Sequence, residues 1–158
     1  MADIEPQPAP LGLPPGTSPA FTSRMSRTVE WGECDPAGII FYPTYYRWMD
    51  AASWRLFEQV GYSAARMRVE HLSMPLVHAE CAFTRSPTFG DACVIESSVE
   101  RLGVKSFTVC HRFVRATDDT ELASGREARV WCRYEAGPGS PLRGELLPPA
   151  LRARLAGC

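Results

Sequence analysis

Apolar side chains recur along this chain with two different periods. Between residues 44 and 60 they return every three or four positions, which predicts one long amphipathic helix. Elsewhere apolar and polar side chains alternate, as expected for strands with one buried face. The alternating segments, which end near proline, glycine or charged turn residues, are 25–31, 74–85, 91–101, 104–115 and 122–134. The pattern therefore predicts one helix and five strands.

Sequence signals mark both ends of the predicted helix. Pro43 suits the first helical turn, where the N–H that proline lacks would have no partner. Gly61 suits the position just past the last turn, where the backbone becomes left-handed. Residues 62–71 are ambiguous between a loop and one or two further helical turns, and residues 149–155 predict a short terminal helix.

The order of these elements predicts the fold class. One strand, then the helix, then four strands joined by short turns favour an α+β fold. The helix is too apolar to remain exposed, so we expect a five-stranded antiparallel sheet to wrap around it. A single sheet of this kind leaves long edges, which proteins cover or pair. We therefore expect two subunits to pair through an edge strand.

Residues 1–22 differ in composition from the rest of the chain. They contain six prolines and few large apolar side chains, so they bury too little surface to offset the entropy lost on ordering. We expect a disordered arm over 1–22 and one domain over 23–158. Met25 directly precedes the first predicted strand, which makes it a second candidate for the start of the native chain.

Charge and hydropathy argue against two classes of partner. The net charge is −1 among 158 residues, which provides no general attraction to nucleic acid or to an anionic membrane. No apolar run reaches the ~20 residues that a membrane-spanning helix needs. The six cysteines form no C-x-x-C pair, and the start of the chain lacks the pattern of a secretory signal. We therefore expect reduced thiols in a cytoplasmic protein.

The sequence gives little support for a catalytic cysteine or for a metal site. Cys34 has no histidine arranged locally to activate it, so core packing is a better interpretation than nucleophilic catalysis. His71, His78 and His111 do not show the spacing of metal ligands. We expect structural roles for the histidines, no metal ion and no redox cofactor.

The segment from Glu33 to Asp50 carries the strongest chemical signal. It places Asp35 in a tight Asp-Pro-Ala-Gly turn just before the aromatic-rich helix. A helix start offers unpaired backbone N–H groups and a partial positive charge. A carboxylate facing such an end can attack a carbonyl or activate water while the N–H groups hold the developing oxyanion. The alternative is an aspartate that only stabilises the turn and the helix dipole.

This segment also resembles a known signature. Residues 33–53, E-C-D-P-A-G-I-I-F-Y-P-T-Y-Y-R-W-M-D-A-A-S, resemble the signature of hotdog-fold acyl-CoA thioesterases, and most closely that of the 4-hydroxybenzoyl-CoA thioesterase family. Pro43 stands where related short-chain acyl-CoA thioesterases have histidine, which favours the aryl-CoA branch. Shorter matches follow at 75–77, 105–107 and 129–130. The resemblance implies the hotdog fold, a sheet wrapped around one long helix.

The resemblance implies a role for each matching residue. Asp35 falls on the catalytic carboxylate, and Tyr42 falls on the residue whose backbone N–H polarises the thioester carbonyl. Asp50 falls near the aryl end of the acyl pocket. Lys105 and Arg129 fall on basic residues near the phosphates of CoA. The resemblance also implies a homodimer, paired again into a homotetramer, with the sites at subunit interfaces.

Other positions leave the details of substrate binding open. Gly and Val occupy 103–104, where the aryl branch has basic residues ahead of Lys105. The segment around 64–65 is shorter than in the family and lacks its aromatic residue, so the acyl group is not fixed. His78 lies on the strand nearest the expected pocket and is a candidate substrate contact, and Glu80 is a candidate pocket or interface residue.

Several of these charged residues also have ordinary interpretations. Asp50 lies three residues after Arg47 and five before Arg55, so an ion pair along the helix is an alternative to substrate binding. Glu33 suits a solvated position. Arg129, like Lys105, is also compatible with an ordinary surface charge.

The function expected from the sequence is hydrolysis of an aromatic (4-hydroxybenzoyl-like) or short-chain acyl-CoA to the free acid and CoA. Asp35 supplies the carboxylate and the Tyr42 N–H the oxyanion contact, with Asp35 acting as nucleophile or general base. The main rival is a non-catalytic acyl-CoA-binding protein on the same fold, because fold does not determine activity. A hotdog dehydratase is a weaker alternative, since that chemistry needs an aspartate and a histidine acting together, and no such pair is evident.

Overall fold

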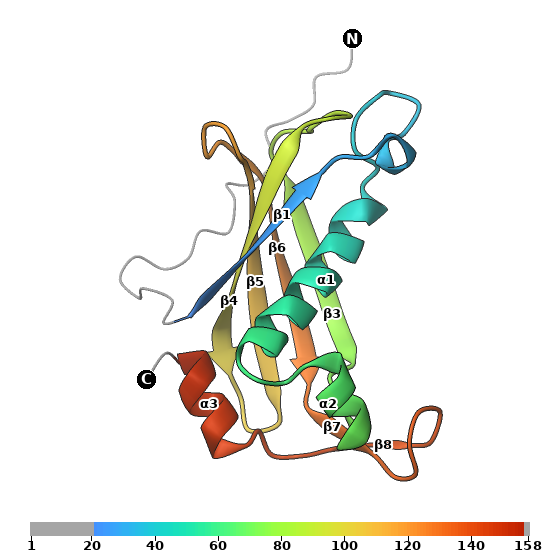
Figure 1. Ribbon diagram of the computed structural model, residues 1–158, viewed down its shortest axis with the longest axis vertical. Coiled ribbons are helices and arrows are strands. Elements are labelled where there is room, and N and C mark those ends of the chain that lie inside the picture. The colour runs from blue at the N-terminus through green and yellow to red at the C-terminus, as the bar shows by residue number, and fades with distance from the viewer. Residues whose placement is uncertain (1–20, 157–158) are drawn as a thin grey trace.

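Five antiparallel strands form one sheet around a single long helix. The computed structural model describes residues 21–156 of the chain. The two edges of the sheet are β1 and β3, and all neighbouring strands are antiparallel (Figure 1). In spatial order the strands are β1 (Thr22–Thr28), β4 (Ala92–Leu102), β5 (Ser106–Arg115), β6 (Glu121–Val130) and β3 (Leu76–Phe83). The predicted α+β fold is confirmed.

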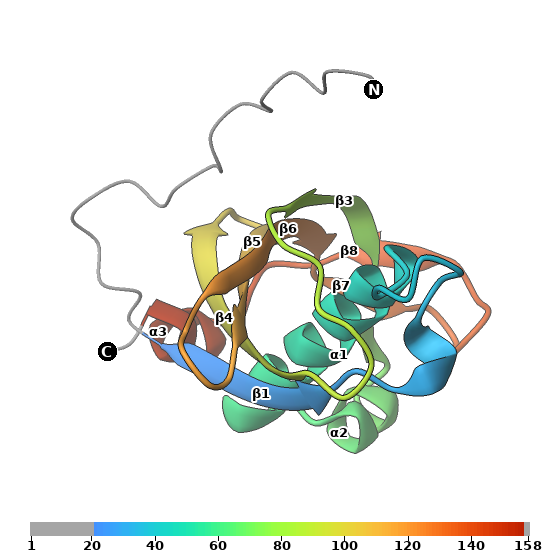
Figure 2. The ribbon, with the colours of Figure 1, turned by 90° about the horizontal axis from the view of Figure 1, so that it is seen from above.

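The long helix is α1 (Pro43–Gln59), and the strands curve around it when the molecule is seen from above (Figure 2). Gly61 follows with a φ of +92°, as predicted for the residue past the last turn. A second helix, α2 (Ala64–Val69), occupies the ambiguous region and is capped by the Ser63 hydroxyl. The predicted terminal helix is α3 (Pro149–Ala156).

The strand predicted over 122–134 is wrong as one continuous element. β6 ends at Val130, and the chain leaves the sheet at Trp131. The buried indole of Trp131 packs in the core while its backbone N–H donates to the Lys105 carbonyl at 2.7 Å. A small second sheet follows, made of β2 (Leu72–Ser73), β7 (Cys132–Tyr134) and β8 (Leu142–Gly144). Strands of two or three residues are too short to show an alternating pattern.

The first strand begins and ends earlier than the predicted segment 25–31. Alternation would place Met25, Arg27 and Trp31 on the same face, but Met25 faces the core while Arg27 and Trp31 are exposed. Thr28 pairs with the first residue of β4, so no partner strand continues beyond it. Trp31 lies instead in the short 3-10 helix η1 (Trp31–Glu33).

The core between α1 and the sheet consists of two apolar clusters separated by a polar band. One cluster joins the second half of α1 to α2, α3 and β5, and the other joins its first half to β1 and the start of β4. Buried polar side chains from four elements form the band: Ser53 of α1, Ser97 of β4, His111 of β5 and Glu127 of β6. His111 thus has the structural environment predicted for it.

The helix passes very close to the sheet at Gly125 of β6. A Cβ atom at this position would lie 2.6 Å from the Met49 sulfur and 3.1 Å from the Glu80 carbonyl oxygen. Only a residue without a side chain allows this approach. The close contact sets the distance between α1 and the middle of the sheet.

The predicted N-terminal arm lies outside the described residues, apart from Phe21 and Thr22. Thr22 already belongs to β1, and Met25 lies within that strand, opposite Ile95 of β4. Across residues 21–156, no helix combines the length and the apolar character needed to cross a bilayer.

Candidate active site

A tight turn holds Asp35 just before the helix. The Gly38 N–H donates to the Asp35 carbonyl at 2.9 Å, and Gly38 adopts a φ of +77° that glycine accommodates without strain. The Ala37 N–H donates to Oδ1 of the Asp35 carboxylate at 2.8 Å. Within the part of the chain that the structure describes, Oδ2 accepts no hydrogen bond. One oxygen of Asp35 therefore fixes the side chain, and the other is free.

The loop that carries this turn folds back onto the start of α1. The Phe41 N–H donates to the Glu33 carbonyl at 2.8 Å, so the two ends of the loop are paired. Glu33, which suits a solvated position from the sequence, is half-buried in the structure. Its carboxylate accepts hydrogen bonds from the Trp48 indole and the Glu30 N–H, both at 3.0 Å. These contacts fasten the loop to the helix and bring the Asp35 turn to the helix start (Figure 1).

The first turn of α1 leaves one backbone donor without a partner. Pro43 has no N–H, the Thr44 N–H donates to the Phe41 carbonyl at 2.8 Å, and the Tyr45 N–H donates to the Tyr42 carbonyl at 3.2 Å. Among residues 21–156, the Tyr42 N–H donates to no group. The positive end of the helix dipole therefore lies at this amide. Such an amide can stabilise an oxyanion.

Tyr42 and two further residues lie on the face of α1 that is beside β3. Tyr42, Tyr46 and Asp50 recur at intervals of four positions, so they lie on the same side of the helix. Burial raises the pKa of Tyr46, and nearby Cys81 and Glu80 of β3 raise it further. The face is therefore close to β3, the edge strand of the sheet.

Asp50 pairs with a residue of the sheet rather than with its helical neighbours. Its Oδ1 accepts a hydrogen bond of 2.7 Å from Nη2 of Arg129 on β6. Arg47 donates to Thr44, and Arg55 donates to the Arg24 carbonyl. The alternative of an ion pair along the helix, with Arg47 or Arg55, is therefore wrong.

Arg129 is not a surface cation. Its side chain is 3% exposed and lies beside the Glu127 carboxylate, at 3.0 to 3.1 Å. This burial argues against the contact with CoA phosphates that the resemblance implies. The burial of its partner Glu127 could not be predicted from the sequence, because a charged residue on a strand is normally interpreted as facing solvent.

Lys105 lies at the end of the sheet nearest β8. Its side chain is exposed, and Nζ donates to the Gly144 carbonyl at 2.9 Å. The neighbouring Arg143 is a further exposed cation and pairs with Glu135. Lys105 and Arg143 are therefore exposed cations near the same strand, β8, which the sequence pattern did not predict.

His78 and Glu80 both lie exposed on β3. Their side chains approach each other at 3.7 Å, and Glu80 also lies 3.8 Å from Arg126 of β6. Both residues lie on the edge strand β3. Their partners on β6, Arg126 and Ala128, alternate with Glu127 and Arg129, which face α1. The side chains of His78 and Glu80 therefore point away from α1, and this argues against the predicted substrate contact of His78.

The described cysteines are free thiols, and burial raises the pKa of three of them, Cys81, Cys93 and Cys132. It raises the pKa of Cys81 to about 12 and that of Cys93 to about 11. Cys34 lies in the loop beside Asp35, where its thiol contacts the Glu30 carbonyl at 3.8 Å. Residues 21–156 contain no group of three or more His, Cys, Asp or Glu side chains that could hold a metal ion.

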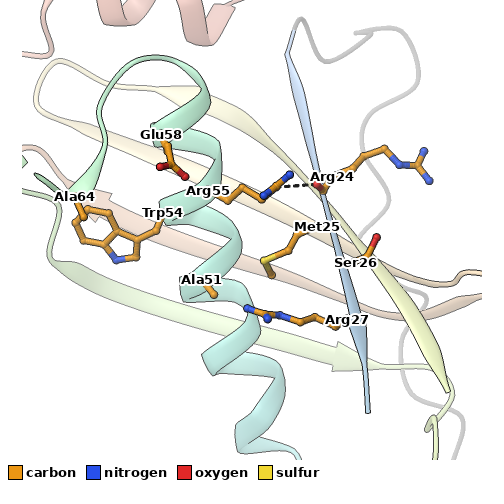
Figure 3. A pocket seen from close by; sticks show the side chains of 9 residues that line it. All are labelled: Arg24, Met25, Ser26, Arg27, Ala51, Trp54, Arg55, Glu58 and Ala64. Atoms are coloured by element: carbon orange, nitrogen blue, oxygen red, sulfur yellow. Dashed lines mark hydrogen bonds between the residues drawn. The ribbon is translucent and has the colours of Figure 1, made fainter. Parts of the chain in front are cut away.

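An open groove lies on the opposite border of α1, between that helix and β1 (Figure 3). Its volume is about 620 Å³, and its lining includes Arg24, Arg27, Arg55 and Trp54. The backbone of β1 already accepts a hydrogen bond from Arg55 there. None of the predicted site residues lines this groove, so the candidate site is the loop and helix start described above.

Comparison with known proteins identifies the family. Residues 29–155 match the thioesterase-like superfamily. A curated relative, 4-hydroxybenzoyl-CoA thioesterase from Pseudomonas sp. (strain CBS-3), is 34% identical over 127 residues, which cover 78% of this chain and 90% of the relative.

Solved structures share the same architecture. A mutant of 4-hydroxybenzoyl-CoA thioesterase complexed with 4-hydroxybenzoyl-CoA has a TM-score of 0.76 at 28% identity, covering 85% of this chain and 98% of that one. A gentisyl-coenzyme A thioesterase has a TM-score of 0.72 at 31% identity, covering 85% of this chain and 99% of that one. This chain therefore adopts the hotdog fold and belongs to the thioesterase-like superfamily.

Proposed function

We propose that this protein is an acyl-CoA thioesterase that hydrolyses CoA esters of aromatic acids to the free acid and CoA. The loop from Glu33 to Phe41 carries the proposal. Its pairing brings the Asp35 turn, with one free carboxylate oxygen, to the end of α1 where the Tyr42 N–H has no partner. A negative group and an oxyanion donor at one helix start are the two parts that hydrolysis of a thioester needs.

In the proposed reaction the thioester carbonyl oxygen accepts a hydrogen bond from the Tyr42 N–H. This bond stabilises the charge that develops as the carbonyl carbon becomes tetrahedral. Asp35 either takes a proton from the attacking water or attacks the carbon itself, forming a mixed anhydride that water then opens. In both routes the C–S bond breaks, and CoA leaves as a thiolate that takes up a proton.

The spacing of Tyr42 and Asp50 supports an aromatic acyl group. Eight helical residues span about 12 Å, and two hydrogen bonds of ~3 Å leave about 6 Å, close to the span of one para-substituted benzene ring. The named relatives act on 4-hydroxybenzoyl and gentisyl esters, which carry ring hydroxyls. We propose that the acyl ring lies between the Tyr42 amide and Asp50, with Tyr46 bordering it.

The CoA portion of the substrate carries several phosphates that need cations. We propose that Lys105 and Arg143, exposed at the end of the sheet, bind these groups. Arg129 is omitted from this set because its guanidinium is buried against Glu127 and Asp50.

We also propose that the protein assembles as a homodimer through β3 and as a homotetramer from two dimers. The outer edge of β3 has no partner strand among the described residues, and it exposes Leu76, Val77 and Phe83. An exposed apolar edge favours pairing with a second copy. The face of α1 with Tyr42, Tyr46 and Asp50 borders this edge, so a partner would complete the pocket. Free thiols support a reducing compartment, the cytoplasm.

A thiol-release assay tests the proposal. The full-length protein is incubated with benzoyl-, 4-hydroxybenzoyl-, phenylacetyl- and butyryl-CoA, and free CoA is measured with a thiol reagent. We expect multiple turnovers, with kcat/KM higher for the benzoyl esters than for the butyryl ester. Tight stoichiometric binding of all four esters without release of CoA would instead favour the non-catalytic alternative.

A further inference from the structure

A buried ion pair lies directly behind Asp50. The side chain of Glu127 is 1% exposed, and Nε and Nη2 of Arg129 both contact its carboxylate. Buried ion pairs lose hydration, and apolar residues of similar volume often stabilise a fold equally well. Stability alone is therefore a weak reason for placing this pair in the core, which suggests a second role.

Arg129 extends the buried pair to the surface. Its Nη1 donates to the Met74 carbonyl at 3.1 Å, and its Nη2 donates to Oδ1 of Asp50 at 2.7 Å. The Asp50 side chain is 54% exposed. Oδ2 of Asp50 accepts no hydrogen bond from residues 21–156. One oxygen of Asp50 is thus tied to the core, and the other is available to a ligand.

Glu127 is held from the opposite side by the polar band. The Ser53 hydroxyl donates to its Oε2 at 2.6 Å, and Nε2 of His111 lies 3.4 Å from the same oxygen. Ser97 lies 2.8 Å from Nδ1 of His111 and orients that ring. Because α1, β4, β5 and β6 all contribute, neither the carboxylate nor the guanidinium can rotate without breaking several contacts.

We propose that Glu127 and Arg129 are positioning residues that hold the Asp50 carboxylate in one orientation and thereby select acyl groups with a hydroxyl at their far end. The inference rests on the proposed function, which puts the acyl ring between Tyr42 and Asp50. Arg129 pairs with both Glu127 and Asp50, so two carboxylates share one guanidinium and the group keeps a net negative charge. The free oxygen of Asp50 accepts a hydrogen bond from a hydroxyl, gains nothing from an unsubstituted ring and repels an anionic group.

The test measures the preference for a hydroxylated ring. In full-length protein, kcat/KM for 4-hydroxybenzoyl-CoA is divided by kcat/KM for benzoyl-CoA, so that changes in the amount of folded protein cancel. Asp50→Ala, Arg129→Lys and the double variant form a mutant cycle. We expect the ratio to fall about tenfold in each single variant, as for loss of one charge-assisted hydrogen bond. The double variant should show no further loss, because Arg129 acts through Asp50.

Two further variants separate positioning from structure. Glu127→Gln keeps the shape of the side chain and tests the pair if Arg129→Lys folds poorly. We expect it to lower the same ratio. Ser97→Ala removes a contact of the same polar band that touches neither Arg129 nor Asp50. It should lower the thermal midpoint and leave the ratio unchanged.

The outcomes distinguish this inference from the proposed function. An active Glu127→Gln or Arg129→Lys enzyme with the wild-type ratio would overturn the positioning role while leaving thioesterase activity intact. Equal loss of the ratio in Ser97→Ala would also overturn it, because the network would then act only by general stability. If the wild-type protein released no CoA from any ester, the proposed function itself would fail.

Discussion

In each of three residues of the candidate site, one polar atom makes a structural hydrogen bond and another has no partner within residues 21–156. Asp35 uses Oδ1 to stabilise its own turn and keeps Oδ2 free. Tyr42 gives its carbonyl to the first helical turn and keeps its N–H. Asp50 repeats the arrangement, with one oxygen bound to Arg129. Because each group is held by one contact, its free atom keeps a defined direction, which is what positioning for catalysis requires.

The pKa of Glu127 predicts a pH dependence of stability. Burial alone would raise this pKa, but hydrogen bonds from His111 and Ser53 and the charge of Arg129 hold it below its ordinary value of 4.5. The unfolded chain therefore binds the proton more readily, and stability is lost as pH falls through the folded pKa. Urea unfolding across the acid range should show a steeper loss for wild type than for Glu127→Gln. Glu58→Gln, at an exposed position, is the control, and parallel curves for wild type and Glu127→Gln would contradict this expectation.

The predictability of individual site residues depended on how local their contacts are. Asp35 and Tyr42 were predictable because one continuous segment contains both the turn and the helix start. The contacts of Glu127 and Arg129 with Ser53, Met74 and Asp50 join residues 55 to 79 positions apart. No local pattern encodes such a pairing, so the sequence indicates an exposed cation at Arg129, either a phosphate contact or a surface charge, and gives no signal for Glu127.

At the scale of elements, periodicity predicted the long regular pieces and missed the short ones. The helix from Pro43 to Gln59 has enough turns for its apolar face to be unmistakable. The end of β6 at Val130 follows from the packing of Trp131, which depends on neighbours in the fold. β2 and β8 are likewise defined by their pairing with β7 rather than by their own sequences.

The contact between α1 and β6 predicts a strict requirement for glycine at position 125. Gly125→Ala would push a methyl group against the Met49 sulfur and the Glu80 carbonyl. We expect a loss of about 1–3 kcal/mol in the free energy of unfolding, as for other overpacked cores. Urea denaturation measures this loss. Gly32→Ala is the matched control, since a Cβ at Gly32 meets nothing within 4 Å, and equal stability of the two variants would refute the argument.

For the whole molecule, the feature most relevant to assembly is the outer edge of β3, which pairs with no strand within residues 21–156. The sequence predicted a sheet with edges, but the spatial order of the strands was needed to show that β3 forms one of them. Its exposed apolar residues lie beside the face of α1 that carries the candidate site. Assembly and activity are therefore expected to depend on the same surface.

A charge on this edge should disrupt assembly. Val77 is 63% exposed on β3, and we expect Val77→Lys to shift the protein toward monomer, because like charges would meet across a paired edge. Light scattering after size-exclusion chromatography gives the mass of each species. Val69→Lys, at an 80% exposed position on α2, should leave the mass unchanged. A Val77→Lys protein that keeps the wild-type mass at all concentrations would exclude β3 as the interface.

Turnover by Asp35→Asn tests the central claim most directly. The substitution keeps an oxygen for the Ala37 N–H and removes the negative charge that attacks or activates water. With 4-hydroxybenzoyl-CoA, we expect kcat to fall by about 10²–10⁴-fold, the usual contribution of such a group. The dissociation constant, measured by calorimetry on the slow variant, should change little, and Cys34→Ala should keep near-normal turnover. Near-normal kcat in a folded Asp35→Asn enzyme would contradict the account.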